Sequence, residues 1–232
     1  MIEQRVDERV RVVTLSRPDR RNALTPDGLD QLETAIADAD EPVVYLHGAG
    51  TAFCAGADLD AVDALEDADA ARDFSARGQR VAQAIETADA IVVAGIDGAA
   101  RGGGVELALA CDVRVATPTA TFGEPGVTFG LFGAWGGTVR LPEIVGLGDA
   151  MEFSVSGRDL SAEEARRIGL VSRIVEQPEA VSHEIAGNDP AALAVLKERL
   201  RDTASKAEQE RREADAFAEL VRERKRRNDD GS

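Results

Sequence analysis

The chain has 232 residues, 44% of them apolar and 4% aromatic, which suffices for one large domain with an ample core. Its net charge of −16 creates a field that repels polyphosphates and anionic lipids, so neither nucleic acid nor a membrane is expected as a partner. The sequence has no bilayer-length apolar run and no signal peptide at its start. These features predict a soluble, cytoplasmic protein.

Arginine dominates the basic residues, because only Lys197, Lys206 and Lys225 are lysines. An acidic, lysine-poor surface fits adaptation to high salt, but it also fits an ordinary acidic protein from a GC-rich genome. Both explanations stay open. Cys54 and Cys111 show no paired spacing, and both are expected to be buried as small apolar side chains.

The first half of the chain alternates strands with helices. Residues 9–16 are β-branched and alternating, which predicts a strand followed by a turn at 17–20. Thr25 and Pro26 open a helix that runs to about Ala39. Apolar residues at 43–46 predict a buried strand that ends in a glycine loop.

The same order recurs further along the chain. One or two surface helices are predicted over 61–89, followed by a buried strand at 91–96 that leads into a triple glycine. This order favours right-handed crossover units stacked in sequence. From Leu147 onward the pattern is mostly helical, with a long charged helix or helix pair over 190–227.

Several chemistries are excluded by residues that the chain lacks. No lysine precedes Lys197, so a Gly-Lys-Ser/Thr phosphate-binding loop is impossible and a Schiff-base lysine in the core is not expected. The only histidines are His47 and His183, which argues against a zinc site, and no Gly-x-Ser-x-Gly motif occurs. No metal is therefore expected. The triple glycine also lacks the spacing of a dinucleotide site.

The triple glycine Gly102–Gly104 precedes an Ala/Leu-rich helix with Glu106 in its first turn. Backbone N–H groups there can approach a ligand oxygen, and Glu106 could move a proton beside a polarised carbonyl. Alternatively, the glycines only allow close packing and Glu106 only complements the helix dipole. A second strand-to-glycine loop at 48–59 offers the further donor that a thioester oxyanion needs.

Five ordered motifs resemble the enoyl-CoA hydratase/isomerase (crotonase) family over about residues 5–175. They are Leu-Ser-Arg-Pro-x-x-Arg-Asn-Ala-Leu at 15–24, Gly-x-Gly-x-Ala-Phe-Cys-Ala-Gly-Ala-Asp-Leu at 48–59, Gly-x-x-x-Gly-Gly-Gly-x-Glu-Leu at 98–107 with Cys-Asp at 111–112, Gly-Gly-Thr-x-Arg-Leu-Pro at 136–142, and Gly-x-x-Leu-Ser-Ala-x-x-Ala-x-x-x-Gly-Leu-Val at 157–171. The resemblance implies an α/β fold, with a crotonase-like spiral of repeated β-β-α units over 1–175. It also implies a helical C-terminal region over 176–232, shorter than usual for the family.

The resemblance further implies an acyl-CoA thioester substrate, with CoA as part of the substrate and no separate cofactor. A homotrimer or a dimer of trimers is expected. The N–H groups of Ala57 and Gly103 would form the oxyanion hole for a thioester enolate, and Glu106 would be the first of the family's two catalytic glutamates. Ala55 lies where the family's backbone contacts the CoA moiety.

Further residues are candidates for the substrate or CoA site. Gly56 and Gly102 belong to the two glycine loops. Arg17, Arg20 and Arg21 supply a basic patch for CoA phosphates, although they also fit an exposed turn. Trp135 is expected in the acyl pocket, with simple core packing as the alternative.

The sequence departs from the hydratase pattern at the second catalytic glutamate. The family's Phe-Gly-x-Pro-Glu stretch is Phe-Gly-Glu-Pro-Gly here, so Gly126 replaces that glutamate and Glu124 is a possible second carboxylate. The leading hypothesis is an enoyl-CoA hydratase-like enzyme with Glu106 as acid and base. The alternatives are a one-carboxylate isomerase, decarboxylase or thioester hydrolase, and a non-catalytic subunit that binds CoA esters.

Overall fold

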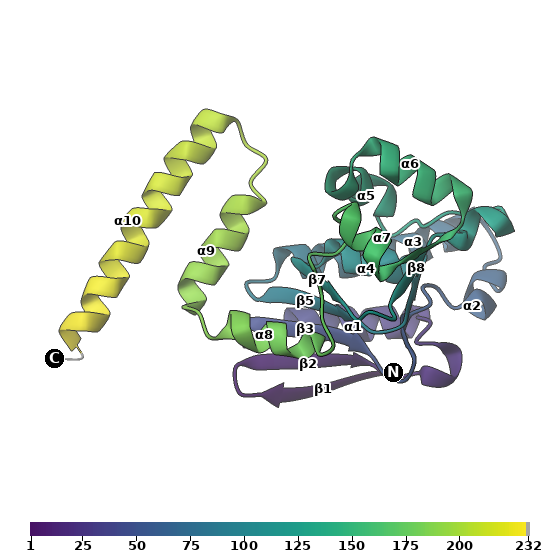
Figure 1. The fold of residues 1–232 in the computed structure, drawn as a ribbon, viewed down its shortest axis with the longest axis horizontal. Coiled ribbons are helices and arrows are strands. Elements are labelled where there is room, and N and C mark those ends of the chain that lie inside the picture. The colour runs from purple at the N-terminus through teal and green to yellow at the C-terminus, as the bar shows by residue number, and fades with distance from the viewer. Residues whose placement is uncertain (231–232) are drawn as a thin grey trace.

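The computed structural model describes residues 1–230, which form two β-sheets with helices around them (Figure 1). The larger sheet has the order β1 (Ile2–Asp7), β2 (Val10–Leu15), β3 (Val43–Gly48), β5 (Ile91–Ile96), β7 (Val113–Ala116) and β10 (Arg173–Ile174). The smaller sheet has the order β4 (Ala52–Cys54), β6 (Ala99–Arg101), β8 (Thr121–Gly123) and β9 (Asp159–Ser161).

Each turn of the chain adds one strand to each sheet. The strands β3, β5 and β7 pair in parallel in the larger sheet, and β4, β6 and β8, which follow them in the chain, pair in parallel in the smaller one. A helix follows most of these strand pairs, as the crossover pattern predicts. The repeated β-β-α units expected from the sequence are therefore present, and the N-terminal hairpin of β1 and β2 precedes them.

The helices that connect the strands are α1 (Pro26–Ala37), α2 (Leu59–Asp63), α3 (Ala68–Thr87), α4 (Gly103–Ala110), α5 (Gly137–Val145), α6 (Leu147–Ser156) and α7 (Ala162–Arg167), with the 3₁₀ turns η1 (Pro18–Arg20) and η2 (Pro125–Phe129). The predicted cap of α1 is confirmed, because the Thr25 hydroxyl accepts a hydrogen bond from the Gly28 N–H. Cys54 and Cys111 are buried, as expected.

Strand alternation divides the core between the two faces of the larger sheet. Val44, Leu46 and Val92 belong to the main core, while Val43 and Tyr45 face the opposite side, where α8 (Pro178–Ala186) packs. A strand that is apolar on both faces must be covered on both faces, and α8 provides the second cover. The helical segment after residue 175 therefore begins in contact with the sheet. The domain boundary at that residue stays a prediction.

The C-terminal helix pair α9 (Pro190–Leu200) and α10 (Lys206–Asp230) extends away from the sheets (Figure 1). Buried Lys197 attaches α9 to the core: its Nζ donates to the carbonyls of Ile85 and Ala90 at 2.9 and 2.8 Å and pairs with Asp112 at 2.9 Å. Arg201 adds a second ion pair with Asp112. Within residues 1–230, no helix combines the length and apolar character that spanning a bilayer requires.

Candidate active site

The N-terminus of α4 is built for close approach to a ligand. Gly102 has φ 49° and ψ −119°, a conformation that favours glycine, and its N–H donates to the Gly123 carbonyl at 2.9 Å. Helix α4 then begins at Gly103 and is buried along its whole length. The N–H of Gly103 has no hydrogen-bond acceptor within residues 1–230, so it is available to a ligand.

The second glycine loop lies against this helix start. Gly56 has φ 87°, and a Cβ atom there would lie 2.8 Å from the Gly103 nitrogen, so the two loops touch at a point that only glycine allows. Leu24 holds the loop on both sides of Ala57. Its N–H donates a hydrogen bond to the Gly56 carbonyl, and its carbonyl accepts one from the Asp58 N–H. The Ala57 N–H is left without an acceptor in the described chain. Two unpaired donors therefore lie on adjoining loops.

Glu106 is buried beside these donors and is held by backbone. Its Oε1 accepts hydrogen bonds from the N–H groups of Trp135 at 2.9 Å and Gly137 at 2.7 Å. Gly133 also packs on the carboxyl group, because a Cβ there would lie 2.7 Å from the Glu106 Cδ. Burial raises the pKa of Glu106, whereas the two N–H donors and nearby Arg140 oppose that rise by favouring the charged form.

Glu124 is a second carboxyl group in the same cleft. It precedes the η2 turn and is half-buried, and burial together with the charge of Glu106 raises the pKa of Glu124 to about 8. Its carboxyl group accepts no hydrogen bond from residues 1–230, in contrast to that of Glu106. The pair is thus asymmetric: burial favours the protonated form of Glu124, whereas two N–H donors favour the anion of Glu106.

Gly126 lies in η2 against the backbone of the following loop. A Cβ atom there would lie 3.0 Å from the Leu131 carbonyl oxygen and 3.1 Å from the Phe132 Cα. A side chain at this position would have to push the loop outward. At the position where the sequence resemblance places the family's second glutamate, the following loop therefore lies against the point where a side chain would begin.

The cleft that contains both carboxyl groups has a volume of about 360 Å³, within the range of small-molecule sites. Its lining is mainly apolar. It includes, among others, Ala55, Ala57, Leu59, Val62, Leu65, Phe74, Gly102, Gly103, Glu106, Glu124, Gly126, Phe129, Leu131, Phe132 and Trp135. Most of the site residues predicted from the sequence are thus brought together, and Gly56 packs directly behind them.

The predicted arginine patch lies outside the lining of this cleft. Arg17 pairs with buried Asp58, and Arg20 pairs with Asp60 at 2.7 Å on the surface. Exposed Arg21 has left-handed backbone geometry, and its carbonyl accepts the Ala55 N–H at 2.9 Å. In this structure Arg17 and Arg20 are thus neutralised by neighbouring carboxylates, and Arg21 positions the glycine loop through its backbone.

The residues that hold the loop above Glu106 in place were not predicted from the sequence. Arg140 makes a bidentate ion pair with Glu86 of α3, and its Nη1 donates to the Trp135 carbonyl at 3.3 Å. Ser75 and Gln79, also from α3, both donate to the Ala134 carbonyl. In the sequence, the only feature that could have indicated this role is that Arg140 is part of the Gly-Gly-Thr-x-Arg motif. Arg140 is a positioning residue, because it acts on Glu106 through the Trp135 peptide.

Replacing Arg140 by Gln is expected to lower kcat by about tenfold to a hundredfold with little change in KM, because the donors on Glu106 lose their position. Loss of the Arg140 charge should also move the acid limb of the pH profile to higher pH, since that charge lowers the pKa of Glu106. Steady-state kinetics across pH measures both effects. Arg173→Gln, which breaks an exposed pair with Glu184, is the matched control. An unchanged acid limb would contradict the positioning role.

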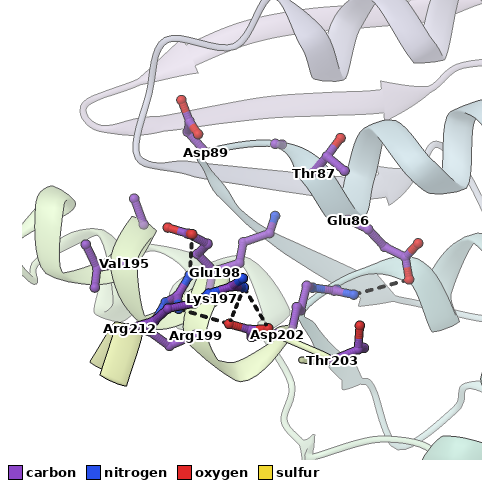
Figure 2. Close-up of a pocket in the computed structure, with 13 residues that line it drawn as sticks. Glu86, Thr87, Asp89, Val195, Lys197, Glu198, Arg199, Asp202, Thr203 and Arg212 are labelled. Carbon is purple, nitrogen blue, oxygen red and sulfur yellow. Dashed lines mark hydrogen bonds and ion pairs between the residues drawn. The ribbon is translucent and has the colours of Figure 1, made fainter. Parts of the chain in front are cut away.

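A second cleft, of about 540 Å³, lies where α9 meets the core (Figure 2). It is strongly charged, but its charges are paired internally: Asp202 accepts from both Arg199 and Arg212, and Arg201 pairs with Glu86. Paired charges leave little net attraction for an ionic ligand. The chemistry therefore concentrates in the smaller apolar cleft with the two carboxyl groups.

Comparison with known proteins agrees with this geometry. The sequence model of the enoyl-CoA hydratase/isomerase family matches residues 5–229. The chain belongs to the enoyl-CoA hydratase/isomerase family. It is 36% identical to the short-chain-enoyl-CoA hydratase of Clostridium acetobutylicum, over 82% of this chain and 77% of that protein. It is 41% identical to the crotonyl-CoA hydratase of Syntrophomonas wolfei, over 77% and 70%.

Solved structures of the family share the fold. An enoyl-CoA hydratase from Bacillus anthracis superposes with a TM-score of 0.88 at 32% identity, covering 95% of this chain and 91% of that one. A putative enoyl-CoA hydratase from Thermobifida fusca, solved in complex with CoA, gives 0.86 at 30% identity, covering 97% and 94%. The crotonase-like fold, the family and an enzyme of the enoyl-CoA hydratase kind, all predicted from the sequence, are confirmed.

Proposed function

We propose that the protein adds water to the double bond of an enoyl-CoA thioester, with Glu106 and Glu124 as its two catalytic carboxyl groups. One observation carries this proposal: the cleft holds a carboxylate stabilised by two N–H donors beside a second carboxyl group whose pKa is raised to about 8 by burial and by the charge of Glu106. The unpaired N–H groups of Ala57 and Gly103 lie at the same cleft. The solved complexes of relatives with CoA and acetoacetyl-CoA support a CoA-linked substrate.

The proposed reaction begins when the thioester oxygen accepts hydrogen bonds from Ala57 and Gly103. Glu106 takes a proton from water as the hydroxide adds to the β-carbon, and the two N–H groups stabilise the enolate that forms. Glu124 then gives its proton to the α-carbon, and the product is a 3-hydroxyacyl-CoA. The proton held by Glu106 returns to Glu124 through solvent to restore the starting state.

Gly126 favours a second reaction class. A site with one working carboxylate can move a double bond, decarboxylate or hydrolyse a thioester, because each of these reactions can use an enolate or oxyanion held by the same donors. A chain that kept only its binding groups would bind CoA esters without turning them over. These two alternatives predict that crotonyl-CoA is not hydrated.

Incubation with crotonyl-CoA tests the proposal directly. Loss of the conjugated thioester absorbance, with 3-hydroxybutyryl-CoA as the product, is the expected result. If the absorbance persists, a 3-enoyl-CoA substrate separates isomerisation from binding alone, since an isomerase would generate the conjugated absorbance. Either of these results would replace hydration as the proposed activity.

We also propose that copies of the chain associate, as the trimer expected for the family implies. Helices α5 and α6 carry a group of exposed apolar side chains, namely Val139, Leu147, Met151 and Val155. Leu147, Met151 and Val155 recur every four residues and so share one face of α6, and exposed apolar surface is typical of protein interfaces. Sedimentation velocity tests the association, and a monomer at micromolar concentration would contradict it. The cytoplasmic location expected from the sequence also stays a proposal.

A further inference from the structure

The apolar lining of the cleft is exposed at some residues and buried at others. Leu59, Phe129 and Phe132 are 54%, 61% and 69% exposed, whereas Trp135 is 3% exposed although it lines the same cleft. A thioester carbonyl held by Ala57 and Gly103 has the acyl chain on one side and sulfur on the other. The bulky CoA moiety needs the exposed part of the cleft, which leaves the buried part beside Trp135 for the acyl chain.

Two glycines make the room that the Trp135 ring occupies. A Cβ atom at Gly78 of α3 or at Gly103 of α4 would overlap the indole, so the ring lies between these two helices. Phe74 packs on it edge-to-face, with the ring centroids 6.1 Å apart. The adjoining backbone is fixed by Glu106, Arg140 and α3. The indole therefore cannot swing aside without unpacking both helices.

We infer that Trp135 limits the length of the acyl chain and restricts the enzyme to short-chain thioesters. The inference rests on the proposed function, because the oxyanion donors fix where the acyl chain begins. Trp135 contacts one of those donors, Gly103, directly. An acyl chain that begins at these donors therefore begins close to the indole. A longer chain has to displace the ring or bend back toward the open end.

Binding of saturated acyl-CoA thioesters tests this without requiring turnover. We expect the wild-type protein to gain no affinity from butyryl-CoA to octanoyl-CoA. In Trp135→Ala, octanoyl-CoA should bind at least about tenfold more tightly than butyryl-CoA, since each newly buried methylene is worth about fourfold in affinity. Trp135→Leu, which keeps part of the buried volume, is the second variant in case the larger cavity prevents folding. Calorimetry measures all of these affinities.

Two controls separate chain length from general weakening. Phe153→Leu makes a core cavity in α6 away from the cleft and should leave the chain-length dependence unchanged. Leu65→Ala enlarges the cleft on the side of α2. If Leu65→Ala lengthens the preferred chain and the Trp135 variants do not, the acyl chain runs toward the open end and the inference is wrong.

Trp135 is the only tryptophan in the chain, so intrinsic fluorescence reports on this ring alone. Butyryl-CoA should change the emission, whereas CoA without an acyl group should leave it nearly constant. Equal effects of the two ligands would contradict contact between the acyl chain and the ring. Because crotonyl-CoA hydration is measured separately on the wild-type protein, failure of the hydratase proposal and failure of this inference give different results.

Discussion

Glu106→Gln is expected to lower kcat for crotonyl-CoA by about 10³-fold, within the range that a positioned acid or base contributes. The amide retains an oxygen that can accept from Trp135 and Gly137, so the local fold should persist. What it loses is a group that can take a proton from water. Binding of butyryl-CoA should change little, because the N–H groups of Ala57 and Gly103 are unaffected.

The measurement is stopped-flow or steady-state hydration of crotonyl-CoA, with calorimetry for butyryl-CoA binding. Glu213→Gln, on the exposed face of α10, is the matched control and should retain full activity. Substantial hydration by Glu106→Gln would remove Glu106 from the mechanism. Loss of butyryl-CoA binding in the same variant would instead indicate that the carboxylate mainly holds the cleft together.

Glu124→Gln is expected to lower kcat by about 10²-fold and to remove the alkaline limb of the pH profile. The sign follows from the raised pKa, which lies at about 8. An acid must be protonated to work, so wild-type activity should be high below pH 8 and fall as the pH rises through that value. Glu124→Gln has no carboxyl group that titrates near pH 8, so its low residual rate should not fall in that range.

Gly126→Glu tests whether the family's usual position could take over this role. Placed in the Glu124→Gln background, it should not restore activity, because a side chain at 126 meets the Leu131 and Phe132 backbone. Gly126→Ala in the same background controls for the effect of displacing the loop. Recovery with glutamate but not with alanine would show that the loop yields, and that Glu124 is replaceable.

The sequence predicted the larger sheet better than the smaller one. Strand β2 alternates β-branched residues, and β3 and β5 contain apolar runs at 43–46 and 91–96, patterns that identify buried strands. Strands β4, β6 and β8 have three residues each and lie inside glycine-rich loops, so no periodicity distinguishes them from loop. Strand β1 was missed as well, because its central residues are polar and exposed at the edge of the sheet.

Site residues were predictable where backbone chemistry determines them. The glycines at 56 and 102 mark positions with positive φ, a requirement that is visible in the sequence. The difference in pKa between Glu106 and Glu124 could not be predicted from the sequence, since it depends on which N–H groups reach each carboxyl group after folding. The sequence did not reveal that the arginines at 17 and 20 pair with Asp58 and Asp60 at the start of α2, which are distant in the chain, and the role of these arginines toward CoA stays a prediction.

Because lysine is scarce, the reactive amines of the molecule are confined to a few places. Of its three lysines, Lys197 is buried where α9 contacts the core, while Lys206 and Lys225 lie exposed on α10. Amine-directed reagents at neutral pH should therefore modify the C-terminal helix and the N-terminal amine, and should leave the walls of the cleft untouched. The protein could be immobilised or labelled through α10 without mutation, with the thioester site still accessible to substrate.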